Sequence, residues 1–150
     1  MQKFRYGMQG ILDLKYRLED QAKGAFAVAK QRYEEELERL ESLHRERDSY
    51  EESLREMMLG ELDFLEIQAV KTGILAKEDA IRKQQRSVQR AEHEMEAASD
   101  KLKELMVDRK THETLKEKAF ENYLLEMAGE EKKETDELVS YRYNSGQEQG

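Results

Sequence analysis

The sequence predicts an all-α fold, a long antiparallel coiled-coil hairpin of two helices, from three observations. Charged residues make up 40% of the chain, against about 25% in ordinary globular proteins, so little of it can be buried. The chain contains no proline, which removes the strongest helix breaker. Apolar residues recur at alternating steps of three and four, a period of about 3.5 residues that is typical of a left-handed coiled coil and argues against disorder.

The first predicted helix spans about residues 3–59. Its seam keeps the coiled-coil spacing except for one short step from Leu40 to Leu43, where we expect local overwinding. The seam residues are Phe4, Met8, Ile11, Leu14, Leu18, Ala22, Ala25, Ala29, Tyr33, Leu37, Leu40, Leu43, Arg47, Tyr50, Leu54 and Met57.

A turn is predicted at about residues 60–63. Gly60 suits the left-handed position that ends many helices. Asp63 suits the N-cap of the next helix, with Glu66 at the third position of a capping box. A connection this short makes the two helices antiparallel neighbours.

The second predicted helix spans about residues 64–140, and residues 144–150 are expected to be a disordered tail. Together, residues 1–143 are predicted to form a single coiled-coil domain. The seam of this helix is interrupted by two polar residues, Lys77 and Gln84. Its members are Ile67, Val70, Ile74, Lys77, Ile81, Gln84, Val88, Ala91, Met95, Ala98, Leu102 and Leu105.

A turn at this place pairs residues whose numbers sum to about 123, within about four. Ala25 then faces Ala98, which predicts a narrow waist of alanine against alanine. Phe4 faces about residue 119, so roughly the last twenty helical residues, about 30 Å, overhang. Aromatic and methionine side chains on such an overhang are typical of a protein-binding surface. The overhang residues without a predicted partner are Phe120, Tyr123, Leu124, Met127, Leu138 and Val139.

Composition and motifs exclude several function classes. The net charge is −8 and bases are interleaved with acids, which disfavours nucleic-acid binding. No apolar run suits membrane insertion or a signal peptide, and the absence of cysteine fits a reducing compartment. His44, His93 and His112 are too widely spaced for a metal site, and no phosphate-loop or hydrolase motif occurs. We therefore expect no enzyme activity, no cofactor and no metal.

Two terminal segments carry a resemblance to a known family. They are "FRYGMQGILDLKYRLEDQAK" near the N-terminus and "LKEKAFENYLLEMAGEEKKETDEL" near the C-terminus. Together they resemble the FliJ family of flagellar protein-export components. The resemblance implies a soluble, cytoplasmic stalk of the flagellar type III export machine, peripherally associated with the export apparatus at the inner membrane. It also implies an antiparallel coiled coil like the central stalk of rotary ATPases.

The resemblance further implies three partners: the hexameric export ATPase ring, whose assembly and activity the stalk promotes, the cytoplasmic domain of the export gate, and export chaperones. The gate-binding residues would be Leu37, Leu40, Leu43 and Arg47. The ATPase-binding residues would be Phe4, Leu12, Asp13, Leu14, Glu19, Asp20, Lys116, Lys118, Tyr123 and Asp136, to which the overhang adds Phe120 and Met127.

Two alternatives remain open from the sequence. One is a structural or homo-oligomeric coiled coil whose overhang pairs with itself. The other is the equivalent stalk of a virulence type III secretion system, which shares the architecture. The leading interpretation expects a monomer when the chain is free.

Overall fold

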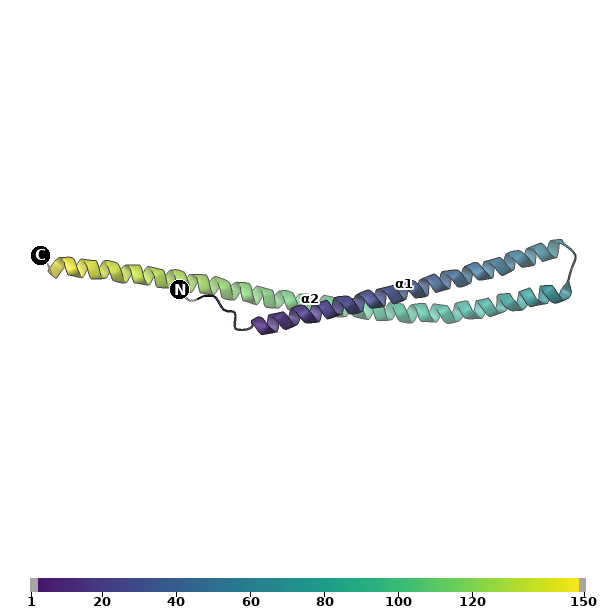
Figure 1. Cartoon of the computed structure of the whole chain (residues 1–150), viewed down its shortest axis with the longest axis horizontal. Coiled ribbons are helices and arrows are strands. Elements are labelled where there is room, and N and C mark those ends of the chain that lie inside the picture. The colour runs from purple at the N-terminus through teal and green to yellow at the C-terminus, as the bar shows by residue number, and fades with distance from the viewer. Residues whose placement is uncertain (1–2, 149–150) are drawn as a thin grey trace. The chain divides into compact units, whose positions relative to one another are not determined.

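The computed structural model describes residues 3–148, which form two long α-helices joined by a short connection. Helix α1 spans Gln9–Leu59 and helix α2 spans Phe64–Glu148 (Figure 1). The two helices pack against each other, and residues 3–148 contain no β-strand. The predicted fold class, an all-α helical hairpin, is confirmed.

The outer ends of the helices differ from the prediction. Helix α1 begins at Gln9 and not at about residue 3, and the amide of Gln9 donates to the carbonyl of Tyr6 at 3.1 Å. Gly7, just before the start of α1, disfavours helix at this point, because a glycine costs about 1 kcal/mol relative to alanine. Helix α2 continues through Glu148, so residues 144–148 are helical and not a disordered tail. Residues 149–150 of the predicted tail lie outside the described residues.

The connection between the helices is ordered by a cap on α2. The Asp63 carboxylate oxygen Oδ1 accepts hydrogen bonds from the backbone amides of Leu65, at 3.1 Å, and Glu66, at 3.3 Å. This is the N-cap that the sequence predicts, and it satisfies amides that have no partner inside the helix. The expectation for Gly60 was wrong, because this residue does not have a positive φ. Helix α1 therefore ends without the left-handed residue that closes many helices.

The chain divides into two compact units, which are described separately. The terminal unit comprises Met1–Leu18 and Leu105–Gly150, and the turn unit comprises Glu19–Glu104. Both helices contribute to both units. The prediction of a single coiled-coil domain over residues 1–143 stays a prediction.

In the turn unit, the seam of α2 follows the predicted series. Every predicted seam residue from Ile67 to Ala98 is buried or half-buried, including the polar Lys77 and Gln84. Both polar residues bind acids on α1. The Lys77 ammonium lies 2.5 Å from the Glu46 carboxylate, and the Gln84 amide donates to the Glu36 carbonyl at 2.9 Å and also to the Glu36 carboxylate.

On α1, the predicted seam of the turn unit is wrong at two inner positions, and a third predicted seam residue, Tyr50, is 38% exposed. Ala25 and Leu37 are exposed, and their neighbours Phe26 and Glu36 are half-buried in their place. The predicted waist of alanine against alanine is therefore interrupted by an aromatic ring. With these two substitutions the seam alternates steps of four and three without a short step, so the reason to expect overwinding disappears. The seam then contains Ala22, Phe26, Ala29, Tyr33, Glu36, Leu40, Leu43 and Arg47.

The predicted register is confirmed by contacts in each unit. In the turn unit, Lys77 pairs with Glu46, and Gly73 lies against the ring of Tyr50, both at numbers that sum to 123. In the terminal unit, the Lys15 ammonium lies 2.7 Å from the Asp108 carboxylate, at the same sum. The position of the turn is therefore sufficient to predict which residues of the two helices face each other.

In the terminal unit, the buried face of α1 is centred on Leu12. Its side chain is 2% exposed, the least of any in the described chain. The predicted seam residues Met8, Ile11 and Leu14 are exposed, and the half-buried Lys15 follows Leu12 in their place. Lys15 is not among the predicted seam residues, although the long apolar stem of a lysine can be buried while its ammonium binds a carboxylate such as Asp108.

Candidate protein-binding site

An aromatic cluster joins the N-terminal segment to α2 in the terminal unit. The ring of Phe4 lies 5.2 Å from that of Phe120, at an interplanar angle of 70°, and 5.4 Å from that of Tyr123. The Phe120 and Tyr123 rings lie 6.2 Å apart. The first of these arrangements is the edge-to-face geometry that aromatic rings favour. The sequence predicted Phe120 and Tyr123 without a partner inside the hairpin, and this is wrong because Phe4 packs on both.

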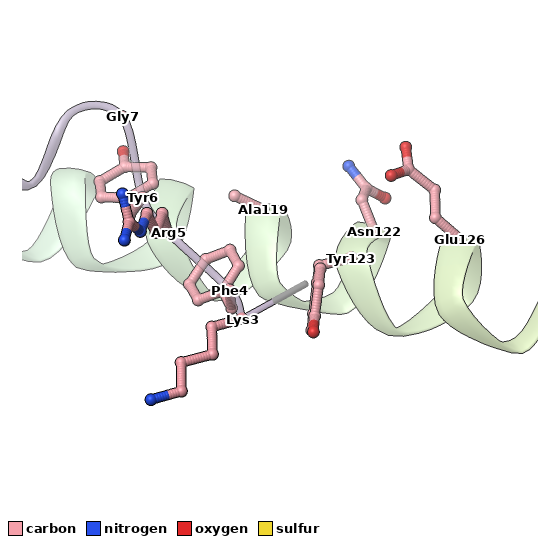
Figure 2. A pocket seen from close by; sticks show the side chains of 9 residues that line it. All are labelled: Lys3, Phe4, Arg5, Tyr6, Gly7, Ala119, Asn122, Tyr123 and Glu126. Carbon is pink, nitrogen blue, oxygen red and sulfur yellow. The ribbon is translucent and has the colours of Figure 1, made fainter. Parts of the chain in front are cut away.

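The non-helical segment before α1 forms a groove with this part of α2. Figure 2 shows Phe4 against the turns of α2 that carry Ala119 and Tyr123. The groove has a volume of about 900 Å³ and combines an apolar floor with charges of both signs. Its lining residues are Lys3, Phe4, Arg5, Tyr6, Gly7, Ala119, Asn122, Tyr123 and Glu126.

Beyond the groove, α2 continues as an exposed helix. Met127 is half-buried, and every residue from 128 to 146 is exposed. This exposed segment keeps several large apolar side chains in spite of its contact with water. They are Leu138, Val139, Tyr141 and Tyr143, and Leu124 and Leu125 precede them. A helix that exposes such residues is typical of a surface that another protein covers.

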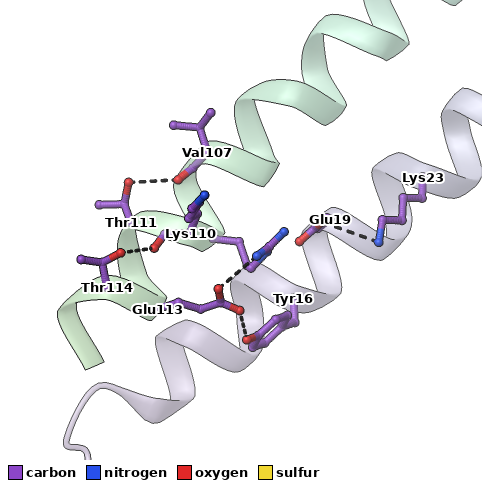
Figure 3. A network of polar contacts seen from close by, with 9 residues as sticks. Tyr16, Glu19, Lys23, Val107, Lys110, Thr111, Glu113 and Thr114 are labelled. Atoms are coloured by element: carbon purple, nitrogen blue, oxygen red, sulfur yellow. Dashed lines mark hydrogen bonds and ion pairs between the residues drawn. The ribbon is translucent and has the colours of Figure 1, made fainter. Parts of the chain in front are cut away.

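The terminal unit also contains a network of polar contacts between its two helices. The Tyr16 hydroxyl donates to the Glu113 carboxylate (Figure 3), which also binds the Arg109 guanidinium at 3.0 Å. The hydrogen bond from Lys15 holds the pKa of the Asp108 carboxyl below its usual value of 3.8. The apolar pattern of the sequence did not single out these residues, although the register would have placed Lys15 opposite Asp108.

The predicted ATPase-binding residues fall into three groups by exposure. Leu12 and Glu19 are buried, so their side chains stabilise the hairpin and are not accessible to a partner. Phe4, Lys116, Tyr123 and Met127 are half-buried. The exposed members are Asp13, Leu14, Asp20, Lys118, Phe120 and Asp136.

These residues do not all belong to one unit. Glu19 and Asp20 belong to the turn unit, and the other predicted ATPase-binding residues belong to the terminal unit. The aromatic cluster brings together Phe4, Phe120 and Tyr123. Asp136 lies thirteen residues beyond Tyr123, within the exposed segment of α2.

The predicted export-gate residues lie on α1 in the turn unit. Leu37 is exposed, whereas Leu40, Leu43 and Arg47 are half-buried. The Arg47 guanidinium lies 3.4 Å from Asp48 and 4.0 Å from Glu51. A partner at this surface would therefore contact Leu37 first and the edges of the other three side chains.

Two further findings concern chemistry that the site could hold. Among residues 3–148, no group of three or more histidine, cysteine, aspartate or glutamate side chains is placed to hold a metal ion. Neither α1 nor the described part of α2 is long and apolar enough to cross a membrane.

Comparisons with known proteins agree with this architecture. A family model described as "Flagellar FliJ protein" matches residues 4–148. A solved structure described as a YscO homolog, CT670, from Chlamydia trachomatis is similar, with a TM-score of 0.79 and 22% sequence identity. The similarity covers 99% of this chain and 100% of that chain, and at this identity it supports the fold alone. A search of curated proteins found no match.

Proposed function

Because the chain belongs to the FliJ family of flagellar proteins, we propose that it is a non-enzymatic stalk and adaptor of flagellar type III protein export. In this proposal its terminal unit binds the centre of the hexameric export ATPase and promotes assembly and activity of that ring. The chain acts in the cytoplasm, next to the export apparatus at the inner membrane, and requires no cofactor.

The exposed end of α2 is the observation that supports this proposal most directly. Residues 128–146 are helical and exposed, although an isolated helix of this length is marginal in water. A ring that surrounds this segment would bury its apolar side chains, among them Leu138 and Val139. Phe120 belongs to the same surface, because its ring is still 43% exposed after Phe4 has packed on it.

The mechanism of activation follows from a difference in symmetry. A single chain of two helices has no six-fold symmetry, so it contacts the subunits of a hexameric ring unequally. Unequal contacts favour different nucleotide states in different subunits, because a ligand shifts a conformational equilibrium by its differential affinity for the states. The exposed Asp13, Lys118 and Asp136 would supply charged contacts, and Leu12 would act only by holding the hairpin together.

A second surface of the proposed adaptor is the export-gate face of the turn unit. Leu37, Leu40, Leu43 and Arg47 bind the cytoplasmic domain of the gate in this proposal. Leu37 is the accessible apolar contact, and Arg47, which is half-buried and paired with Asp48 and Glu51, lies ten residues further along α1. Export chaperones are the third class of partner.

Stimulation of the cognate export ATPase tests the first part of the proposal. Substituting Leu124 and Met127 with serine removes apolar side chains from the exposed and half-buried surface of the terminal unit. We expect stimulation to fall at least tenfold, because truncating central apolar contacts commonly costs about 2 kcal/mol or more. The matched control replaces Val28 and Leu75, two exposed apolar residues of the turn unit, and should keep full stimulation.

Two outcomes would contradict the ATPase assignment. One is undiminished stimulation by the Leu124→Ser/Met127→Ser variant with its helical content intact by circular dichroism. The other is a stable homodimer in sedimentation equilibrium that the same variant dissociates, since the exposed helix would then pair with itself.

Binding to the purified cytoplasmic domain of the export gate tests the second part. Leu37→Asp should weaken that binding at least tenfold, and Val28→Asp, also at an exposed apolar position of the turn unit, should leave it unchanged. Equal affinities of the wild type and the Leu37→Asp variant would remove this face from the proposal.

A further inference from the structure

The connection between the helices exposes a dense group of apolar side chains in the turn unit. Five large apolar residues within the eight-residue stretch 58–65 are between 58% and 89% exposed. Single exposed apolar residues are ordinary, but a contiguous group of this density marks an interaction site. The group consists of Met58, Leu59, Leu62, Phe64 and Leu65, which we call the turn patch.

Packing of the hairpin does not require the turn patch. On α1 the last half-buried residue is Met57, and on α2 the first buried residue is Ile67. The patch lies between them on an ordered backbone, because Asp63 caps α2 through the amides of Leu65 and Glu66. An exposed apolar group on a fixed backbone loses little conformational entropy when it binds.

The charged residues within the stretch that carries the turn patch are all acidic, and the nearest bases in the sequence are Arg55 and Lys71. From Glu56 to Gln68 the sequence has four acids and neither lysine nor arginine, in contrast to the alternating charges elsewhere in the chain. The acids are Glu56, Glu61, Asp63 and Glu66, and all four are exposed. The preceding base, Arg55, lies 3.6 Å from Glu52. The surroundings of the patch therefore favour a positively charged partner.

We propose that the turn patch binds a basic amphipathic helix of another protein. The apolar face of such a helix would cover Leu62 and Phe64, and its lysine or arginine side chains would face Glu56 and Glu61. A second copy of this chain would bring like charges together, and an anionic membrane surface would be repelled for the same reason. The turn patch shares no residue with the export-gate face, and the inference does not rest on the proposed function.

Two designed peptides provide the test. Both are fluorescein-labelled helices of roughly 18 residues with the same leucine face. One carries lysine on its polar face and the other carries glutamate. Fluorescence anisotropy at near-physiological salt should give binding of the lysine peptide by the intact chain that is at least tenfold tighter than binding of the glutamate peptide.

Variants with matched controls separate the turn patch from general attraction to an acidic chain. Leu62→Ser/Phe64→Ser should weaken binding of the lysine peptide at least tenfold, whereas Val28→Ser/Leu75→Ser, of similar exposure in the same unit, should not. Glu56→Gln/Glu61→Gln should weaken it more than Glu38→Gln/Glu96→Gln, an equal loss of charge at exposed positions of the turn unit.

Three results would overturn the proposal. The first is equal binding of the two peptides, and the second is an equal loss in the variants and their controls. The third is a dimer in sedimentation equilibrium, or binding to anionic vesicles, that Leu62→Ser/Phe64→Ser abolishes. Circular dichroism of every variant verifies the fold, which substitutions at these exposed residues should leave intact.

Discussion

Two segments of α2 have the same backbone and opposite surroundings. In residues 81–91 of the turn unit, four residues at coiled-coil spacing are buried: Ile81, Gln84, Val88 and Ala91. In residues 128–146 of the terminal unit, every residue is exposed, and several are large and apolar. The difference shows that apolar residues in a helix indicate a buried position only where a second helix packs against it. Where none does, the same residue types mark a surface for another molecule.

The largest expected effect contrasts a charge at Ile81 with one at Val139. Ile81→Asp places a carboxylate at a position that is 5% exposed, and we expect a loss of about 3–5 kcal/mol in the free energy of unfolding. Val139→Asp, at a position that is 61% exposed, should change it by no more than about 0.5 kcal/mol. Urea unfolding followed by circular dichroism measures both. A similar loss in the free energy of unfolding for both variants would contradict the difference in burial between the two segments.

Two alanine substitutions compare a buried and an exposed leucine within the terminal unit. Leu12→Ala removes the most buried side chain and should cost about 2 kcal/mol or more, because it leaves a cavity as well as losing apolar contact. Leu125→Ala, on the exposed side of α2, should stay within about 0.5 kcal/mol of the wild type. Thermal unfolding of the two variants provides the measurement, and an unaffected Leu12→Ala protein would show that this end of the hairpin is not packed.

Two glycines of α2 test the same contrast between packed and exposed segments through substitutions that should stabilise the helix. A methyl group at Gly73 would meet the Tyr50 ring at 3.4 Å, an ordinary contact, and alanine is the better helix former. Gly73→Ala should therefore raise the free energy of unfolding by up to about 1 kcal/mol. At Gly129 nothing lies within 4 Å, so Gly129→Ala should increase helical content without moving the unfolding midpoint. Destabilisation by Gly73→Ala would mean that the Tyr50 ring cannot adjust.

The smallest effect concerns protonation of Asp108. The Lys15 hydrogen bond lowers the pKa of this carboxyl in the folded chain below 3.8, so the pair stabilises the fold above that pH. The contribution is lost as pH falls through the lowered pKa. An NMR titration of Lys15→Met should show the Asp108 pKa rising towards 3.8. Lys133→Met, in the exposed segment, is the control, and an unchanged Asp108 pKa in Lys15→Met would show that the Lys15 ammonium is not what lowers it.

The two helices differ in how well the sequence predicted them. On α2 all twelve predicted seam positions are buried or half-buried, because its apolar series was followed through Lys77 and Gln84. On α1 the predicted seam contains the apolar Leu14 and Leu37, whereas their polar neighbours Lys15 and Glu36 are the half-buried residues. The short step predicted at Leu43 resulted from that choice. A regular spacing was therefore the better guide than the hydrophobicity of single residues.

Part of the candidate site was also beyond the sequence pattern. The predicted register places Phe4 opposite about residue 119, but the prediction assigned Phe120 and Tyr123 to the overhang and so missed the contacts of both rings with Phe4. The non-helical path of residues 3–8, which forms one wall of the groove, has no periodic signal. Gly7 lies in this segment and disfavours helix, whereas Gly10 and single glycines elsewhere in the chain are tolerated inside helices.

The bond between Gln84 and Glu36 has a mechanical consequence for the turn unit. Gln84 is 7% exposed, and its amide donates to both the backbone and the side chain of Glu36. If one helix slid along the other, the buried Gln84 amide would lose both of its hydrogen-bond acceptors, because both belong to Glu36. A buried amide without an acceptor is unfavourable. A buried polar residue of this kind fixes the alignment of paired helices. A force along the axis of the turn unit would therefore move its two helices together, and one helix would not slide past the other.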